Sequence, residues 1–186
     1  MGVDLLSGER ILWQGSPVRR SVFLRQDPKW IRFSLKFDAV LLVFLTAVVG
    51  LLHLWLGPVD SWTVKFTAGM FAASVALHHA EPFVWRFLTL HRTTYYVTNH
   101  RVVSTPGRRA RAVKLAEIDA LSYDRNADGT GYVRLDHRVM PDGFGNGTVA
   151  ELIHVPDVDE VVALLANLTG RTPAQTLPKP DSASAL

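Results

Sequence analysis

The 186-residue sequence contains no cysteine, which excludes disulfide bonds, thiolate zinc sites and a cysteine nucleophile. It also has no charged residue between Ala39 and Leu56, a run of eighteen residues. The preceding segment, residues 1–36, is rich in polar and charged residues, whereas a secretory signal peptide has its apolar core near the N-terminus. We therefore expect the apolar run to remain in the mature protein.

The uncharged run predicts a first transmembrane helix over residues 37–56. A helix needs about 20 apolar residues to cross a hydrocarbon layer of about 30 Å. The alternative is a buried core helix, but such helices usually keep a polar stripe along one side.

A second transmembrane helix is predicted over residues 62–90, joined to the first by an external turn at 57–61. Its cleanest part is Phe66–Leu77, which has no charge. Tryptophan favours the membrane–water interface. The tryptophans bracket the two predicted spans in pairs that lie about 35 and 37 Å apart at 1.5 Å per residue. The predicted interface anchors are Trp30, Trp55, Trp62 and Trp85.

Basic residues flank the predicted spans on the side of the two chain termini. Seven of them are candidate topology determinants or lipid-headgroup ligands: Arg20, Arg25, Lys29, Arg32, Lys36, Arg86 and Arg92. The external turn has only Lys65 nearby. Because Lys and Arg are retained on the cytoplasmic side, both termini are predicted to be cytoplasmic. The same basic residues leave open a contact with anionic lipids.

Residues 91–170 predict a cytoplasmic, mostly β domain. Short alternating runs rich in β-branched and aromatic residues are separated by turn sequences, among them Asp128-Gly129. An amphipathic pattern over Val158–Leu168 then predicts a helix that stops at Gly170. Residues 171–186 are rich in Pro, Ser and Ala and are expected to be disordered.

Several segments, in their order along the chain, resemble the bacterial pleckstrin-homology-like membrane proteins. They are Gly8–Pro17 (GERILWQGSP), the two spans, Tyr95–Val103 (YYVTNHRVV) and Val155-Pro156-Asp157. The resemblance implies an α+β membrane protein, with a two-helix transmembrane hairpin and a PH-like antiparallel β-barrel capped by the C-terminal helix. It also implies that residues 1–36 contribute a strand, at Glu9–Gln14, to the barrel.

The opening segment, together with Asp128-Gly129-Thr130-Gly131, is also similar to the PH-domain photosynthetic-complex assembly proteins of purple bacteria. These resemblances imply a multi-pass protein of the bacterial inner membrane. They also imply an accessory or assembly role.

The candidate intramembrane polar cluster is His78, His79 and Glu81. Ionisable groups in a span are costly in lipid and therefore suggest a function, either polar packing and oligomer contact or metal, haem or proton chemistry. Asp124–Gly129 matches half of a calcium loop, but the twelfth position is Leu135 where a glutamate is required, so a hairpin turn is expected. No catalytic residue, metal site or cofactor is predicted.

The sequence therefore predicts a non-enzymatic, membrane-anchored PH-like module that acts as an accessory, assembly or scaffolding subunit. Its expected partners are the lipid bilayer and other membrane subunits or copies of itself, with no nucleic acid and no small-molecule substrate. Two alternatives stay open. One is a redox or proton-handling subunit that uses His78, His79 and Glu81, and the other is a module that binds anionic lipids.

Overall fold

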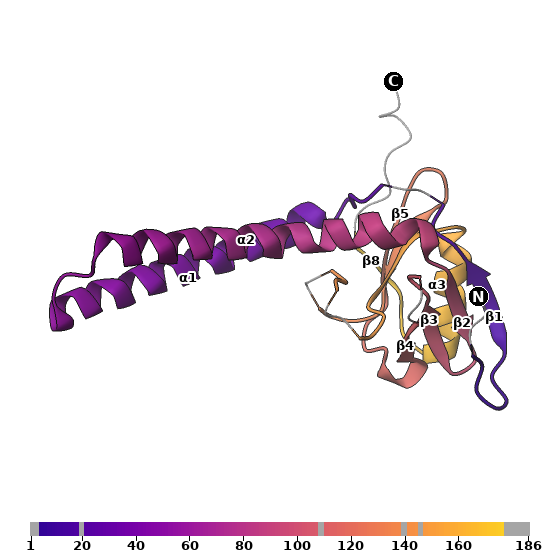
Figure 1. The fold of residues 1–186 in the computed structure, drawn as a ribbon. Coiled ribbons are helices and arrows are strands. Elements are labelled where there is room, and N and C mark those ends of the chain that lie inside the picture. Colours follow the sequence, from indigo (N-terminus) through magenta and orange to yellow (C-terminus); the bar gives the residue numbers. More distant parts are fainter. Residues whose placement is uncertain (1–3, 19–20, 108–109, 139–140, 145–146, 177–186) are drawn as a thin grey trace, which may run out of the picture. The chain divides into compact units, whose positions relative to one another are not determined.

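A computed structural model describes residues 4–18, 21–107, 110–138, 141–144 and 147–176 (Figure 1). The chain divides into two compact units. One comprises Met1–Val22 and Trp85–Leu186 and is called the β-domain below; the other, Phe23–Val84, is called the helix pair. The β-domain is therefore discontinuous in sequence, with the helix pair inserted into it.

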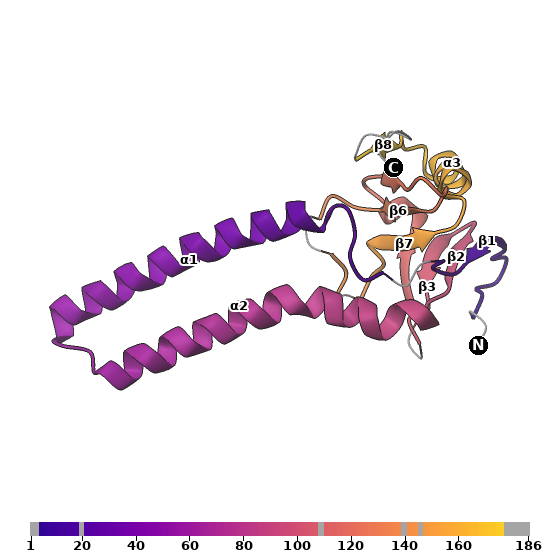
Figure 2. The ribbon, with the colours of Figure 1, turned by 90° about the horizontal axis from the view of Figure 1, so that it is seen from above.

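The helix pair consists of α1 (Asp27–Leu56) and most of α2 (Ser61–Thr89). Asp60 caps the start of α2, because its carboxylate accepts hydrogen bonds from the amide and the hydroxyl of Thr63 at 2.9 and 2.6 Å. The two helices run antiparallel (Figure 2), and contacts join Asp38 to His79 and Trp30 to Phe83. α1 begins ten residues before the predicted span, whereas α2 matches its predicted span to within one residue at each end.

Among the described residues, one helix is long and apolar enough to cross a membrane, over Asp27–Trp55. None of its most apolar part is buried inside the protein. Large apolar side chains along it face outward, including Phe37, Val43 and Leu54, which are 63, 70 and 80% exposed. The second helix carries more polar residues and does not meet the same standard of length and hydropathy.

The β-domain contains two four-stranded sheets. The first is antiparallel, in the order β1 (Ile11–Gly15), β2 (Tyr95–Thr98), β3 (Arg101–Ser104), β4 (Arg111–Lys114). The second has the order β7 (Glu151–Val155), β6 (Gly131–Arg134), β5 (Ser122–Arg125), β8 (Ala174–Gln175). Short 3₁₀ turns lie at Leu90–Arg92 and Leu115–Glu117. The sequence prediction of a mixed α+β protein is confirmed, while the described strands form two separate sheets and no closed barrel.

The final helix, α3 (Val158–Thr169), packs with its apolar side on the core of the β-domain. It ends at Gly170, whose φ of 67° is the left-handed conformation that glycine adopts readily. At its other end, the backbone of Gly131 in β6 lies so close that an added Cβ would come within 2.6 Å of Val158 Cγ2. Glycine is therefore required where the helix crosses the strand.

Two segments differ from, or refine, the sequence prediction. The N-terminal strand β1 pairs with β2, which places residues from before the helices in the same sheet as residues from after them. Ala174 and Gln175 form β8, parallel to β5, within a tail expected to be disordered. Backbone hydrogen bonds hold it there, since Ala174 N–H donates to the carbonyl of Leu121 at 2.9 Å. Residues 177–186 of that tail lie outside the described part of the chain.

Candidate functional site

The polar residues of the helix pair form one layer across the two helices. His79 Nε2 lies 2.8 Å from Asp38 Oδ2, and both side chains are largely buried. The Trp30 ring packs against the imidazoles of His79 and His78, with centroid distances of 5.6 and 6.2 Å. The pair formed by His79 and Asp38 can hold one proton between an imidazole and a carboxylate. Glu81, the third predicted member, is half-buried on the same helix.

Of the predicted aromatic anchors, Trp55 and Trp62 are 81 and 69% exposed at the ends of the two helices that meet at the loop. Trp30 is different: it is 5% exposed, because it lies between the helices against the histidines. Trp85 is half-buried in the β-domain. The structure thus places two of the four rings where they face the surroundings of the helices.

Most of the predicted basic residues lie at the surface. Those exposed are Arg25, Lys29, Arg32, Lys36 and Arg92. Arg20 lies outside the described residues. Among the described residues, no group of three or more His, Cys, Asp or Glu side chains is arranged to hold a metal ion.

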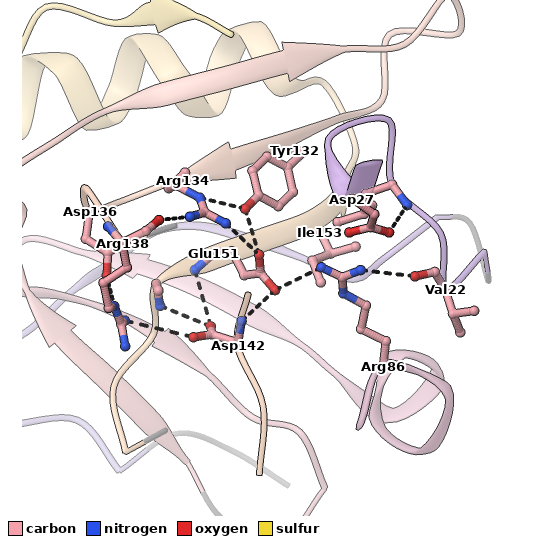
Figure 3. Close-up of polar contacts among 12 residues, drawn as sticks. Val22, Asp27, Arg86, Tyr132, Arg134, Asp136, Arg138, Asp142, Glu151 and Ile153 are labelled. Carbon is pink, nitrogen blue, oxygen red and sulfur yellow. Dashed lines mark hydrogen bonds and ion pairs between the residues drawn. The ribbon is translucent and has the colours of Figure 1, made fainter. Parts of the chain in front are cut away.

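Arg86 has a location that the sequence did not predict. Its side chain is 2% exposed inside the β-domain, so it does not face lipid headgroups. Its Nη1 donates to the carbonyl of Val22 at 3.2 Å, and its Nη2 lies 3.6 Å from Glu151 Oε1 (Figure 3). Trp85 and Arg86 directly follow an apolar run, which is why the sequence suggested a membrane flank. Its charged partner, Glu151, lies 65 positions further along the chain, on β7.

Glu151 is the centre of what we call the buried charge cluster, whose other members are Arg86, Tyr132, Arg134 and Asp142 (Figure 3). Its carboxylate accepts a hydrogen bond from the Tyr132 hydroxyl at 2.6 Å and another from the Asp142 amide at 3.0 Å. Arg134 Nη2 lies 3.5 Å from the same carboxylate. Two guanidinium groups and two hydrogen bonds offset the cost of burying the charge.

Asp142 joins the cluster through the backbone. Its Oδ2 accepts hydrogen bonds from the amides of Ala150 and Glu151 at 3.1 and 3.3 Å, which fixes the start of β7. Burial and the nearby charge of Glu151 raise the pKa of Asp142 to about 7. Burial also raises the pKa of Tyr95, whose hydroxyl accepts the amide hydrogen of Ile153 at 3.1 Å.

A cavity of about 30 Å³ adjoins the cluster and is lined by Trp85, Arg86, Tyr95, Arg111, Asp142 and Glu151, among others. Small-molecule sites commonly occupy about 300–1,000 Å³, so this cavity suits one or two water molecules. Two open hollows of about 500 and 560 Å³ meet on the outer surface along Asp119, Asp136 and His137. In the cluster, the carboxylates of Glu151 and Asp142 are held by hydrogen bonds and ion pairs from within the β-domain.

A second network holds the N-terminal segment to the first sheet. Glu9 binds Arg101 through both carboxylate oxygens, at 2.8 and 3.0 Å, and also accepts the hydroxyl of Thr98 at 2.8 Å. The hydrogen bond from Arg101 is the main cause that lowers the pKa of Glu9 to about 2. Asn99 completes the network by bonding the backbone of Arg10 and Gly8 at 2.8 and 3.2 Å. Two of the segments that carry the family resemblance, Gly8–Pro17 and Tyr95–Val103, are therefore in direct contact.

Comparison of the chain with protein-family models, with curated proteins and with solved structures found no match. The resemblance to the bacterial PH-like membrane proteins accordingly stays a sequence-based prediction.

Proposed function

We propose that this chain is a non-enzymatic accessory, assembly or scaffolding subunit of a membrane protein complex. In this proposal α1 and α2 cross the bacterial inner membrane as a hairpin, and the β-domain, with a PH-like fold, lies in the cytoplasm with both termini. The observation that supports it best is the outward-facing apolar surface of the helix pair.

Among the described side chains of α1, thirteen large apolar ones are at least one-third exposed. Leaving a Leu or Phe side chain in water costs about 1.5–3 kcal/mol relative to burying it. For partly exposed side chains the total is on the order of 10–20 kcal/mol, as large as the whole stability of a typical domain. A lipid environment removes this cost.

The geometry of the helix pair favours a crossing by α2 together with α1. Only Gly57–Asp60 separate the helices, so the chain must return beside α1. The bond between Asp38 and His79 lies eighteen residues from Leu56, or about 27 Å at 1.5 Å per residue. This distance is close to the thickness of the hydrocarbon layer, about 30 Å. The polar layer then lies at the inner edge of the hydrocarbon, where a buried imidazole–carboxylate pair is least costly.

The distribution of charge favours cytoplasmic termini. The first part of α1 carries exposed Lys29, Arg32 and Lys36, whereas the loop end of the hairpin carries Asp60 and Lys65. Positive charge is retained in the cytoplasm. The loop is therefore expected outside.

An assembly role is favoured because the charges around Glu151 are paired within the β-domain and the cavity beside them has room only for water. Such a domain provides a rigid surface that suits protein contacts. The short bond between His79 and Asp38 supports one alternative, a proton-handling subunit, since this pair can exchange a proton within the helix pair.

Topology can be tested directly because the chain has no cysteine. Single replacements Ser61→Cys, at the loop, and Glu160→Cys, on α3, are both at exposed positions. In intact cells an impermeant maleimide should label Ser61→Cys, and it should label Glu160→Cys only after lysis. Labelling of Glu160→Cys from outside would reject the proposed orientation.

The assembly role is tested by purification from mild detergent. The full chain should elute with other membrane subunits, and simultaneous replacement of His78, His79 and Glu81 by alanine should leave the activity of that complex unchanged. A chain that elutes alone as a monomer would reject assembly, and a loss of proton or electron transfer in the triple variant would favour the alternative.

A further inference from the structure

A stack of three side chains lies on the β-domain where α2 ends. The Arg111 guanidinium lies over the Trp85 ring, with Cζ 4.2 Å from its centroid. The Phe144 ring meets the Trp85 ring edge-on at 4.9 Å. Arg111 also donates hydrogen bonds to the carbonyls of Gly143 and Phe144, at 3.0 and 3.4 Å. Three segments distant in sequence are thus fixed to one another, and we call them the Trp85 stack.

The Trp85 stack presents apolar surface. Phe144 is 52% exposed, and on the last turns of α2 Phe87 and Leu88 are 72 and 49% exposed. An exposed phenylalanine is unfavourable in water, since its burial is worth up to about 3 kcal/mol. Arg111 supplies a positive charge at the stack, and residues 86–114 contain seven Lys or Arg and no Asp or Glu.

Trp85 belongs to the last part of α2. Trp62 and Trp85 are 23 residues apart on one helix, or about 35 Å. The hydrocarbon layer is about 30 Å thick and the bilayer with headgroups about 40–45 Å. A helix that crosses with Trp62 at the outer interface therefore places Trp85 among the inner headgroups. Arg111 and Phe144 contact Trp85 within the β-domain.

We propose that the Trp85 stack is a lipid-contact site, at which Phe144 enters the headgroup layer of the inner leaflet beside Trp85 and Arg111. The inference rests on the proposed membrane crossing of α2. It adds a second contact with the bilayer, made by the β-domain. Tryptophan and phenylalanine with adjacent arginine match the chemistry of an interface that contains phosphate groups and acyl chains.

The test uses single cysteines in the full chain, reconstituted into vesicles of phosphatidylcholine and phosphatidylglycerol and labelled with an environment-sensitive fluorophore. Phe144→Cys reports the stack. Val43→Cys, at an outward position of α1, reports membrane insertion, and Glu160→Cys on α3 is the aqueous control. Nitroxide lipids labelled near the headgroup should quench the Phe144 label, whereas aqueous iodide should quench the Glu160 label.

The outcomes separate the two proposals. A Val43 label quenched by lipid together with a Phe144 label quenched only by iodide keeps the membrane crossing and overturns the lipid-contact site. Iodide quenching of both labels rejects the crossing itself. Protection of the Phe144 label from iodide in native membranes, but not in lipid vesicles, also overturns the inference. In that case another protein, and not lipid, would cover the stack. A second variant, Phe144→Ser, loses the edge-on contact with the Trp85 ring but no core packing, so the full chain should still unfold cooperatively on heating in detergent.

Discussion

Glu151→Gln should destabilise the β-domain strongly, because the substitution removes a charge that faces two buried guanidinium groups. The side chains of Arg86 and Arg134 are 2 and 14% exposed and lie 3.6 and 3.5 Å from the carboxylate. Breaking a buried ion pair from one side typically costs about 3–5 kcal/mol. Glutamine keeps an acceptor for the Tyr132 hydroxyl, and loss of the Glu151 charge lowers the pKa of Asp142, which then supplies part of the missing charge. We therefore expect the free energy of unfolding to fall by about 3 kcal/mol.

The assay is thermal unfolding of the full chain in mild detergent, followed by near-UV circular dichroism of the packed tyrosines. The expected loss corresponds to a fall of roughly 10 °C in the unfolding midpoint. The matched control is Glu117→Gln, because Glu117 is 54% exposed and pairs with Lys114 at 3.3 Å on the surface. The control should cost less than about 0.5 kcal/mol. Equal midpoints for the two variants would refute a cluster stabilised by the charge of Glu151.

Three further predictions concern other contacts. Asp142→Asn should stabilise the β-domain at pH 8 by about 1–3 kcal/mol and flatten its pH dependence. In the unmodified domain the pKa of the Asp142 carboxyl is raised from 3.8 to about 7, so the folded state holds this proton more tightly than the unfolded state. The domain therefore loses stability as the pH rises from about 4 to about 7. Thermal unfolding at pH 5 and at pH 8 measures this loss. Gly131→Ala should cost about 1–3 kcal/mol in thermal unfolding, because its Cβ would lie 2.5 Å from the Asp124 carbonyl; Gly147→Ala, which has open space, should be neutral. Asp38→Asn should weaken the helix pair by about 0.6 kcal/mol, and at most about 1.7, in titration with a denaturing detergent. If Asp38→Asn is as stable as the unmodified chain, the hydrogen bond between Asp38 and His79 contributes nothing to stability.

The sequence predicted the features that depend on local pattern. The hydropathy pattern predicts the two long helices. Alternating apolar and polar residues on either side of the Asp128-Gly129 turn predict the hairpin of β5 and β6. The pairing of Asp38 with His79 was also within reach, because an antiparallel hairpin centred on Gly57–Asp60 brings these two positions level. The hydropathy of α2 singles out the histidines but gives no sign of Asp38 as the partner of His79.

Features that depend on distant partners were not predictable in this way. Arg86 looks like a membrane-flanking arginine until Glu151 is brought beside it by the β-domain. Strand β8 is two residues long and is held by backbone hydrogen bonds, so its side chains carry almost no signal. Trp30 has the spacing of an interface anchor, but its ring packs between the helices because His78 and His79 face it.

The pairing of β1 with β2 affects how the protein is made. Gly15 lies opposite Tyr95 in the ladder, so the chain leaves the sheet and rejoins it at adjacent points 80 residues apart. During synthesis β1 emerges first and has no partner until the helices have been made. The helices must therefore leave the ribosome before β1 and β2 can pair, and the sheet closes only after residues 16–94 have been made. Replacing the helix pair with a short Gly-rich linker between β1 and β2 should yield a domain that folds without any bilayer.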